Sequence, residues 1–85
     1  MFEPNDASTW SAVRALVESY LLAKWRAGSL AGATPREAFY VRCGIGSTMT
    51  EEDIAAGRLV LEVGVATVRP AEFIVLRIAH AIEPD

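Results

Sequence analysis

The chain has 85 residues, a net charge of −3 and a hydrophobic content of 52%, so it is long enough for one small domain and too short for two separate cores. This content excludes intrinsic disorder, and we expect a single domain, residues 1–85, with more apolar surface than so short a chain can bury alone. The acidic balance argues against nucleic-acid binding. No apolar stretch approaches the ~18 residues of a membrane span, so no direct membrane binding is expected.

The first predicted element is a long helix from about residue 7 to 27. Asp6 is one of several polar residues that could cap its start, and Gly28 suits the backbone conformation that follows a helix end. Apolar residues recur along this segment at helical spacing and predict a stripe that packs against a strand. The stripe consists of Trp10, Val13, Leu16, Val17, Tyr20, Leu21 and Trp25.

Three short elements follow this helix. The segment from Thr34 to Glu37 has the pattern of a capping box with proline at the first helical position, and it leaves room for one turn. The aromatic and β-branched residues of 39–43 then predict a strand. Thr50 is expected to cap a second short helix, which has three carboxylates in its first turn and ends at Gly57.

Two strands are predicted in the last third of the chain. Residues 58–66 alternate between apolar and other residues, with Leu59, Leu61, Val63 and Val65 on one face. The run 72–79 is, after Glu72, apolar on both faces except for Arg77. Because Pro70 discourages a tight hairpin, we expect residues 67–71 to be extended and the last strand to pair away from the strand before it. A proline at Val75 is then expected to remove one hydrogen bond of the ladder.

These elements predict an α+β fold in the order α-β-α-β-β. A small β-sheet would be covered by the long N-terminal helix, with a second short helix. The helix stripe is expected to pack on Val41 and the apolar face of residues 58–66.

Few residues of the chain could take part in catalysis or bind a metal. Cys43 and His80 are the single cysteine and histidine, and a cysteine enzyme that pairs them is one hypothesis, but an inert buried thiol is the simpler interpretation. The segment 44–47 resembles part of a phosphate loop yet has no lysine after it, so a turn is favoured. We therefore expect no enzyme, no metal and no cofactor.

Basic residues on the first helix form a weak patch, consisting of Arg14, Lys24 and Arg26. A solvated face is the simpler interpretation, and a docking surface is the alternative. The residues alone favour an interaction module, and a small ligand-binding or regulatory module remains as a second hypothesis.

Specific motifs run almost from end to end of the chain. They include Trp25-Arg26-x-Gly28-x-Leu30 followed by Gly32-Ala33-Thr34-Pro35, and Arg69-Pro70-Ala71-Glu72-Phe73 ahead of the last strand. In these motifs the chain resembles the C-terminal domain of contractile phage tail sheath proteins. Chains of that family are several hundred residues long, which implies that other domains precede this one.

The resemblance implies a structural subunit domain that polymerises around an inner tube by strand exchange between neighbouring subunits. Its partners would be other sheath subunits and the tube protein. The particle would be a virion tail or phage-like particle assembled in the host cytoplasm. The expected strand-donating residues are Phe73, Ile74, Val75, Leu76, Arg77 and Ile78, and Arg14, Lys24 and Arg26 could face the tube.

Overall fold

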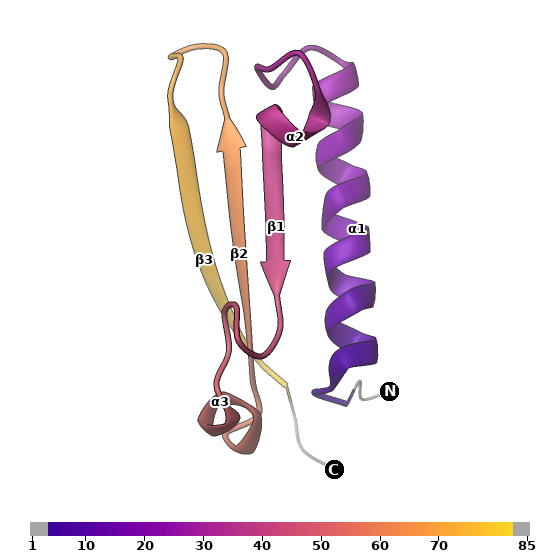
Figure 1. Cartoon of the computed structure of the whole chain (residues 1–85), viewed down its shortest axis with the longest axis vertical. Coiled ribbons are helices and arrows are strands. Elements are labelled where there is room, and N and C mark those ends of the chain that lie inside the picture. Colours follow the sequence, from indigo (N-terminus) through magenta and orange to yellow (C-terminus); the bar gives the residue numbers. More distant parts are fainter. Residues whose placement is uncertain (1–3, 83–85) are drawn as a thin grey trace.

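The computed structural model describes residues 4–82 as an α+β domain, which confirms the predicted fold class. Figure 1 shows one long helix standing beside a three-stranded sheet. The elements in chain order are α1 (Ala7–Arg26), α2 (Pro35–Ala38), β1 (Phe39–Cys43), α3 (Glu51–Ala55), β2 (Arg58–Ala66) and β3 (Phe73–Ala81).

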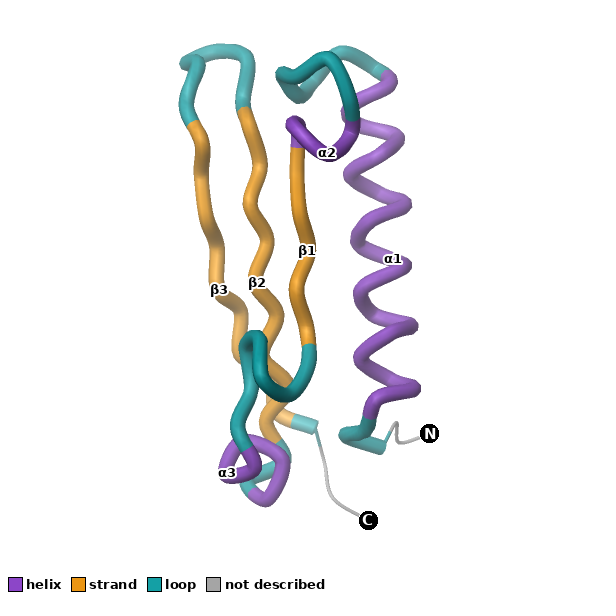
Figure 2. The backbone as a smooth tube through the Cα atoms, in the orientation of Figure 1, coloured by secondary structure: helices purple, strands orange, loops and turns teal. Residues whose placement is uncertain are grey.

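The sheet is antiparallel in the order β1-β2-β3, and its three strands run side by side in Figure 2. β2 pairs with β3 over nine residue pairs, from Arg58 opposite Ala81 to Ala66 opposite Phe73. The prediction that the last strand pairs away from the strand before it is therefore wrong. Within this chain the two strands form a regular hairpin.

The connection between these strands explains the difference. Residues 67–72 form a six-residue loop and not a tight two-residue turn, as the sequence predicted, but residues 68–70 bend instead of running extended. The Thr67 N–H donates to the Glu72 carbonyl at 2.8 Å and closes the loop. Pro70 lies inside the loop, so its missing N–H removes nothing from the ladder.

The start of α1 is fixed by side chains that precede it. Asp6 is the N-cap, and its Oδ1 accepts a hydrogen bond from the Thr9 N–H at 3.1 Å. The indole N–H of Trp10 donates to Asn5 Oδ1 at 2.7 Å, and Asn5 Nδ2 donates to the carbonyl of Arg58 at 2.9 Å. The first turn of the helix is thereby attached to the start of β2.

Part of the predicted apolar stripe is not in the core. Leu21 is 8% exposed, but Leu16 is 73% exposed and Tyr20 is 61% exposed. The stripe spans more than the buried arc of the helix, because α1 packs mainly on β1 and leaves its flanks open. Trp10, Val13 and Val17 lie at the edge of the core, half-buried.

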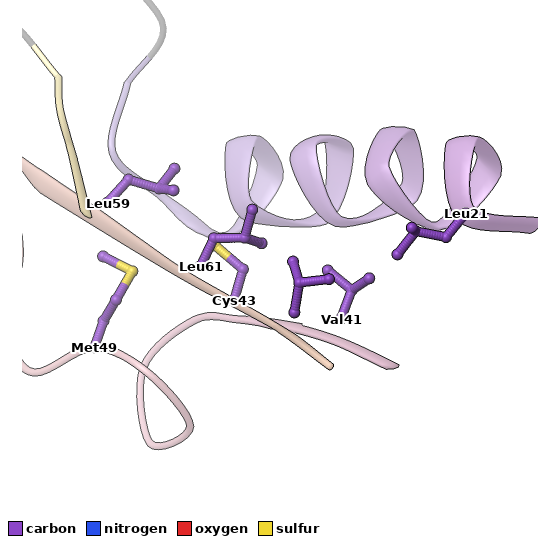
Figure 3. Close-up of a cluster of buried hydrophobic side chains, with 7 residues drawn as sticks. Leu21, Val41, Cys43, Met49, Leu59 and Leu61 are labelled. Atoms are coloured by element: carbon purple, nitrogen blue, oxygen red, sulfur yellow. The ribbon is translucent and has the colours of Figure 1, made fainter. Parts of the chain in front are cut away.

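The core lies between α1 and the face of the sheet formed by β1 and β2. Figure 3 shows Leu21 pointing from the helix toward side chains of these strands. The buried cluster contains Leu21, Val41, Cys43, Met49, Leu59, Leu61 and Val63. The predicted partners of the helix on β1 and β2 are thus confirmed, whereas β3 is the edge strand farthest from α1 (Figure 1).

The two capping predictions have opposite outcomes. Thr34 occupies the N-cap of α2 but makes no side-chain cap, so the capping box predicted there is wrong. Thr50 and Asp53 form a complete capping box at α3, and Arg58 Nε donates to Asp53 Oδ1 at 2.9 Å. The Thr50 N–H, followed by the Arg58 side chain, holds the pKa of Asp53 below its usual value.

The glycine-rich segment after β1 is a turn and not an anion site. The N–H groups of Ser47, Thr48 and Met49 all donate to the carbonyl of Gly44, so they do not point at a ligand. The buried Thr48 hydroxyl donates to the carbonyl of Val60 at 2.6 Å and fastens this turn to β2.

The domain is elongated, with extents of 42 × 21 × 17 Å and a Cα radius of gyration of 14.2 Å. A compact chain of this length would have a radius of about 12 Å. Among residues 4–82, no helix has the length and hydrophobicity needed to cross a bilayer.

Candidate subunit interface

β3 is the least covered element of the sheet, and it contains all the predicted strand-donating residues. Phe73 is 53% exposed, Val75 is 51%, Leu76 is 52% and Ile78 is 48%. These residues alternate between the two faces of the strand, so β3 exposes apolar side chains on both. Its main contacts among the elements are with β2. The sequence predicted the two apolar faces, but not that both would lie open.

Hydrogen bonds at the two ends of the hairpin fix which groups of β3 point toward β2. Thr67 bonds to Glu72 at the loop, and the Ile82 N–H donates to the Gly57 carbonyl at 2.6 Å at the other end. Bonded pairs alternate along an antiparallel ladder, so every second pair between these two is also bonded. The residues of β3 whose N–H and C=O groups face β2 are therefore Ile74, Leu76, Ile78 and His80.

The intervening residues of β3 direct their backbone groups away from the sheet, along its free edge. These residues are Phe73, Val75, Arg77 and Ala79. The expectation that a proline at Val75 would remove a bond of the ladder is therefore wrong, because the Val75 N–H points outward. A proline at Leu76 would remove such a bond.

On the face of the sheet that α1 occupies, β3 continues the apolar surface beyond the helix. Ile74, Leu76 and Ile78 are opposite Val65, Val63 and Leu61, respectively. α1 packs against β1 and does not extend over β3. This row of β3, which we call the helix-side row, is an apolar strip next to the core.

An aromatic contact spans the opposite, outer face of the sheet. The rings of Tyr40 on β1 and Phe73 on β3 are stacked, with centroids 6.0 Å apart and planes inclined at 22°. Between them lies Gly64 of β2, and a Cβ atom at this position would overlap the Tyr40 ring. Glycine is therefore required if the two rings are to meet across β2.

Charged side chains continue this arrangement across the three strands. Glu62 on β2 lies between Arg42 on β1, at 3.8 Å from Nη1 to Oε2, and Arg77 on β3, at 3.4 Å from Nε to Oε1. The Tyr40 hydroxyl donates to Glu62 Oε2 at 2.9 Å, and this bond is the main cause of a raised Tyr40 pKa. We call Tyr40, Arg42, Glu62, Gly64, Phe73 and Arg77 the outer-face cluster. The sequence pattern did not predict this cluster, although the alternation of residues 58–66 places Glu62 and Gly64 on one face.

The basic residues of α1 are not brought together into one patch. Arg14, Lys24 and Arg26 are all exposed. Lys24 and Arg26 lie in the last turn, about 15–18 Å along the helix from Arg14. The Lys24 ammonium lies over the Tyr20 ring, 5.2 Å from its centroid.

The hypothesis of a cysteine enzyme finds no support in the geometry. Cys43 is buried in β1, and desolvation raises the pKa of its thiol. His80 is an exposed residue of β3. These strands are separated by β2, so the two backbones are about 10 Å apart and the side chains form no hydrogen-bonded pair.

An open hollow of about 410 Å³ lies between α1, α2 and β1. Its lining contains Glu18, Pro35, Arg36, Phe39, Tyr40 and Val41. No pattern in the sequence predicted this hollow. Within residues 4–82 no group of three His, Cys, Asp or Glu side chains is placed to hold a metal ion.

Comparison with known proteins finds one matching family model and several similar solved structures. The family model described as phage tail sheath C-terminal domain matches residues 1–80. A chain of the structure of an extracellular contractile injection system, the PVC sheath complex in its contracted state, is 50% identical with a TM-score of 0.78; the match covers 92% of this chain and 22% of that chain.

A chain of the anti-feeding prophage (AFP) baseplate is 44% identical with a TM-score of 0.78, over 96% of this chain and 23% of that chain. A second AFP baseplate structure, in the contracted state, gives 41% identity and a TM-score of 0.75, over 92% of this chain and 20% of that chain. This chain thus spans less than a quarter of the length of each of these three chains. No curated protein matches it.

Proposed function

The chain belongs to the family of phage tail sheath C-terminal domains, and from this premise we propose that it is a structural domain of a contractile sheath that polymerises around an inner tube. The family is one of structural proteins rather than enzymes. The particle would be a virion tail or a phage-like particle assembled in the host cytoplasm. The solved relatives, which are parts of contractile injection systems, support this assignment.

We propose further that β3 connects neighbouring subunits by strand exchange. In the exchanged form, β3 leaves its own sheet and takes the same place beside β2 of a neighbour. The observation that carries this proposal is that β3 makes its main contacts with β2 alone and is about half exposed along both faces. Its release therefore breaks one ladder and uncovers little of the core.

Exchange is energetically balanced because the same contacts form again in the neighbour. The nine pairs between β2 and β3 are lost within one chain and regained between two chains, as in other domain-swapped assemblies. The six-residue loop of residues 67–72 acts as the hinge. A free chain keeps β3 in its own sheet because the intramolecular partner is always close, and exchange becomes favourable when subunits are concentrated in a growing sheath.

The second proposed partner is the inner tube, and we assign its contact to the exposed cations of α1, namely Arg14, Lys24 and Arg26. α1 and β3 lie on opposite sides of the domain in Figure 1. One subunit has room, on this arrangement, for a tube contact through its helix and a neighbour contact through its last strand.

The ladder provides a matched pair of variants that tests strand exchange in the full chain. Leu76→Pro removes an N–H that faces β2, whereas Val75→Pro removes one that faces the free edge. We expect the wild-type chain to form discrete oligomers as its concentration rises, measured by size-exclusion chromatography with light scattering. Val75→Pro should behave similarly, and Leu76→Pro should remain monomeric while circular dichroism shows that its helix content is retained.

Isotope-filtered NMR on a mixture of labelled and unlabelled wild-type chains identifies the exchanged strand directly. We expect contacts between Leu61 of one chain and Ile78 of another, because these residues are opposite each other in the ladder. Wild-type chains that stay monomeric at millimolar concentration would refute the proposal. Loss of oligomers in Val75→Pro but not in Leu76→Pro would show that neighbours add to the free edge instead.

A further inference from the structure

The apolar residues of β3 cannot by themselves define which register β3 adopts beside β2. The helix-side row pairs three branched aliphatic residues of β3 with three of β2. If β3 slipped by two residues, each side chain would keep its face and most would still be opposite an aliphatic residue. The helix-side row therefore distinguishes the correct register from this slip only weakly.

The outer face of β3 carries residues of different kinds, so a slip is costly there. In the observed register Arg77 is opposite Glu62, and Phe73 reaches the Tyr40 ring across Gly64. A slip by two residues in either direction would place Arg77 opposite Val60 or Gly64. Both slips would break the Arg77–Glu62 pair. The slip that places Arg77 opposite Gly64 would also carry Phe73 opposite Val68, away from the Tyr40 ring.

The residues of β1 and β2 that meet Phe73 and Arg77 are also bound to one another, through contacts that do not involve β3. The Tyr40 hydroxyl and Arg42 both bind Glu62, and the guanidinium of Arg42 lies 4.8 Å from the centroid of the Tyr40 ring. The Glu62 side chain is only 17% exposed, which strengthens its interactions with the cations. β1 and β2 thus hold an aromatic ring and a carboxylate in fixed positions beside the place of β3.

We propose that Tyr40, Glu62 and Gly64 form a register-selecting site, which accepts an extended segment that carries an aromatic residue and, four positions later, an arginine. In this chain Phe73 and Arg77 provide this pattern. The proposal rests on the proposed strand exchange where the segment comes from a neighbouring subunit. The site acts on a strand from the same chain in the same way.

Selection of the β3 register by this site matters more when β3 comes from another chain than when it comes from the same chain. Within one chain, a slip by two residues also changes the length of the six-residue loop by two, which adds a small penalty to the slip. A strand from another subunit has no such restraint. Its register in the exchanged sheet then depends on the outer-face cluster.

A charge exchange between two full-length variants tests the site. In the acceptor variant, Arg42→Glu and Glu62→Arg are combined, so the arginine introduced on β2 keeps an acidic neighbour on β1. In the strand variant, Arg77→Glu is the only change. Each variant by itself places like charges at positions 62 and 77, whereas mutual exchange between the two variants places opposite charges there in both sheets.

We expect a 1:1 mixture of differently tagged variants to form about tenfold more hetero-oligomer than either variant forms homo-oligomer, since opposite charges directly across a ladder are favourable and like charges unfavourable. Native mass spectrometry measures the species. A mixture that gives the statistical distribution, with wild-type chains exchanging normally, would overturn the selecting role and leave strand exchange intact.

The register within one chain tests the site independently of exchange. Contacts between Hα protons identify non-bonded pairs of the ladder, here Glu62 with Arg77 and Gly64 with Val75. We expect Arg77→Glu to show additional Hα contacts that correspond to β3 slipped by two residues. A chain that combines Arg42→Glu, Glu62→Arg and Arg77→Glu should show the native contacts alone. If wild-type chains do not exchange, the proposed function fails and these contacts still decide the inference. A purely native set in Arg77→Glu would contradict it.

Discussion

Two leucines five residues apart on α1 illustrate what a helical stripe does and does not specify. Leu16 and Leu21 both belong to the predicted stripe, yet one is 73% exposed and the other 8%. Five residues correspond to a rotation of about 140° around the helix axis, so the two side chains lie on different sides. The sequence predicted that α1 is amphipathic, but the width of its buried arc depends on the strands that cover it.

These leucines make a matched pair for a stability measurement. Leu21→Ala should lower the free energy of unfolding by about 2–5 kcal/mol, because Leu21 is part of the buried cluster. Leu16→Ala should change it by less than about 0.5 kcal/mol, as is usual for exposed positions. Urea denaturation followed by circular dichroism provides both values. Equal effects of the two changes would mean that the core has been assigned to the wrong face of α1.

At the scale of elements, the sequence predicted that β3 is a strand but not what it pairs with. Alternation and β-branched residues depend on local geometry, and they were sufficient to predict both β2 and β3. The partner of β3 depends on whether the loop of residues 67–72 closes, and Pro70 gave the wrong indication there. The outer-face cluster was missed for a related reason, since Tyr40 and Phe73 meet only after three strands are placed in register.

The orientation of the ladder predicts an alternating pattern of hydrogen exchange along β3. In dilute monomeric protein, the N–H groups of Ile74, Leu76 and Ile78 should exchange slowly because they bond to β2. Those of Val75 and Arg77 should exchange at rates close to those of an unfolded peptide. NMR of the chain in deuterated water measures each amide separately. Equal protection of both sets would show that the free edge of β3 is covered.

At the scale of the whole molecule, the domain is closer to a rod than to a sphere, with one axis of 42 Å and two of 21 and 17 Å. β3 stands apart from α1, and the buried cluster is restricted to the region between α1, β1, β2 and the Met49 turn. Much of the apolar surplus noted in the sequence is thus left on β3 rather than folded into a larger core. Composition indicated that the chain would leave apolar surface exposed, but only the structure shows that four of the eight exposed large hydrophobic residues lie on this one strand.

This shape predicts the scattering of the free monomer. In dilute solution, small-angle X-ray scattering should give a radius of gyration near the 14.2 Å of the Cα trace and above the ~12 Å of a compact chain. Dilution is needed because exchanged oligomers would increase the value. A radius at or below 12 Å would contradict the extended arrangement of β3 and α1.

The attachment of both described ends of the chain to the start of β2 has a mechanical consequence. Asn5 holds the carbonyl of Arg58, and Ile82 holds that of Gly57, while the loop to β3 lies at the opposite end of the 42 Å axis. A force applied between the C-terminal end of β3 and the loop end of β2 acts parallel to the strands and perpendicular to the hydrogen bonds of the ladder. All bonds of the ladder then share the load in shear, instead of opening one after another as in a zipper. The domain should resist stretching along its length far better than peeling from its edge.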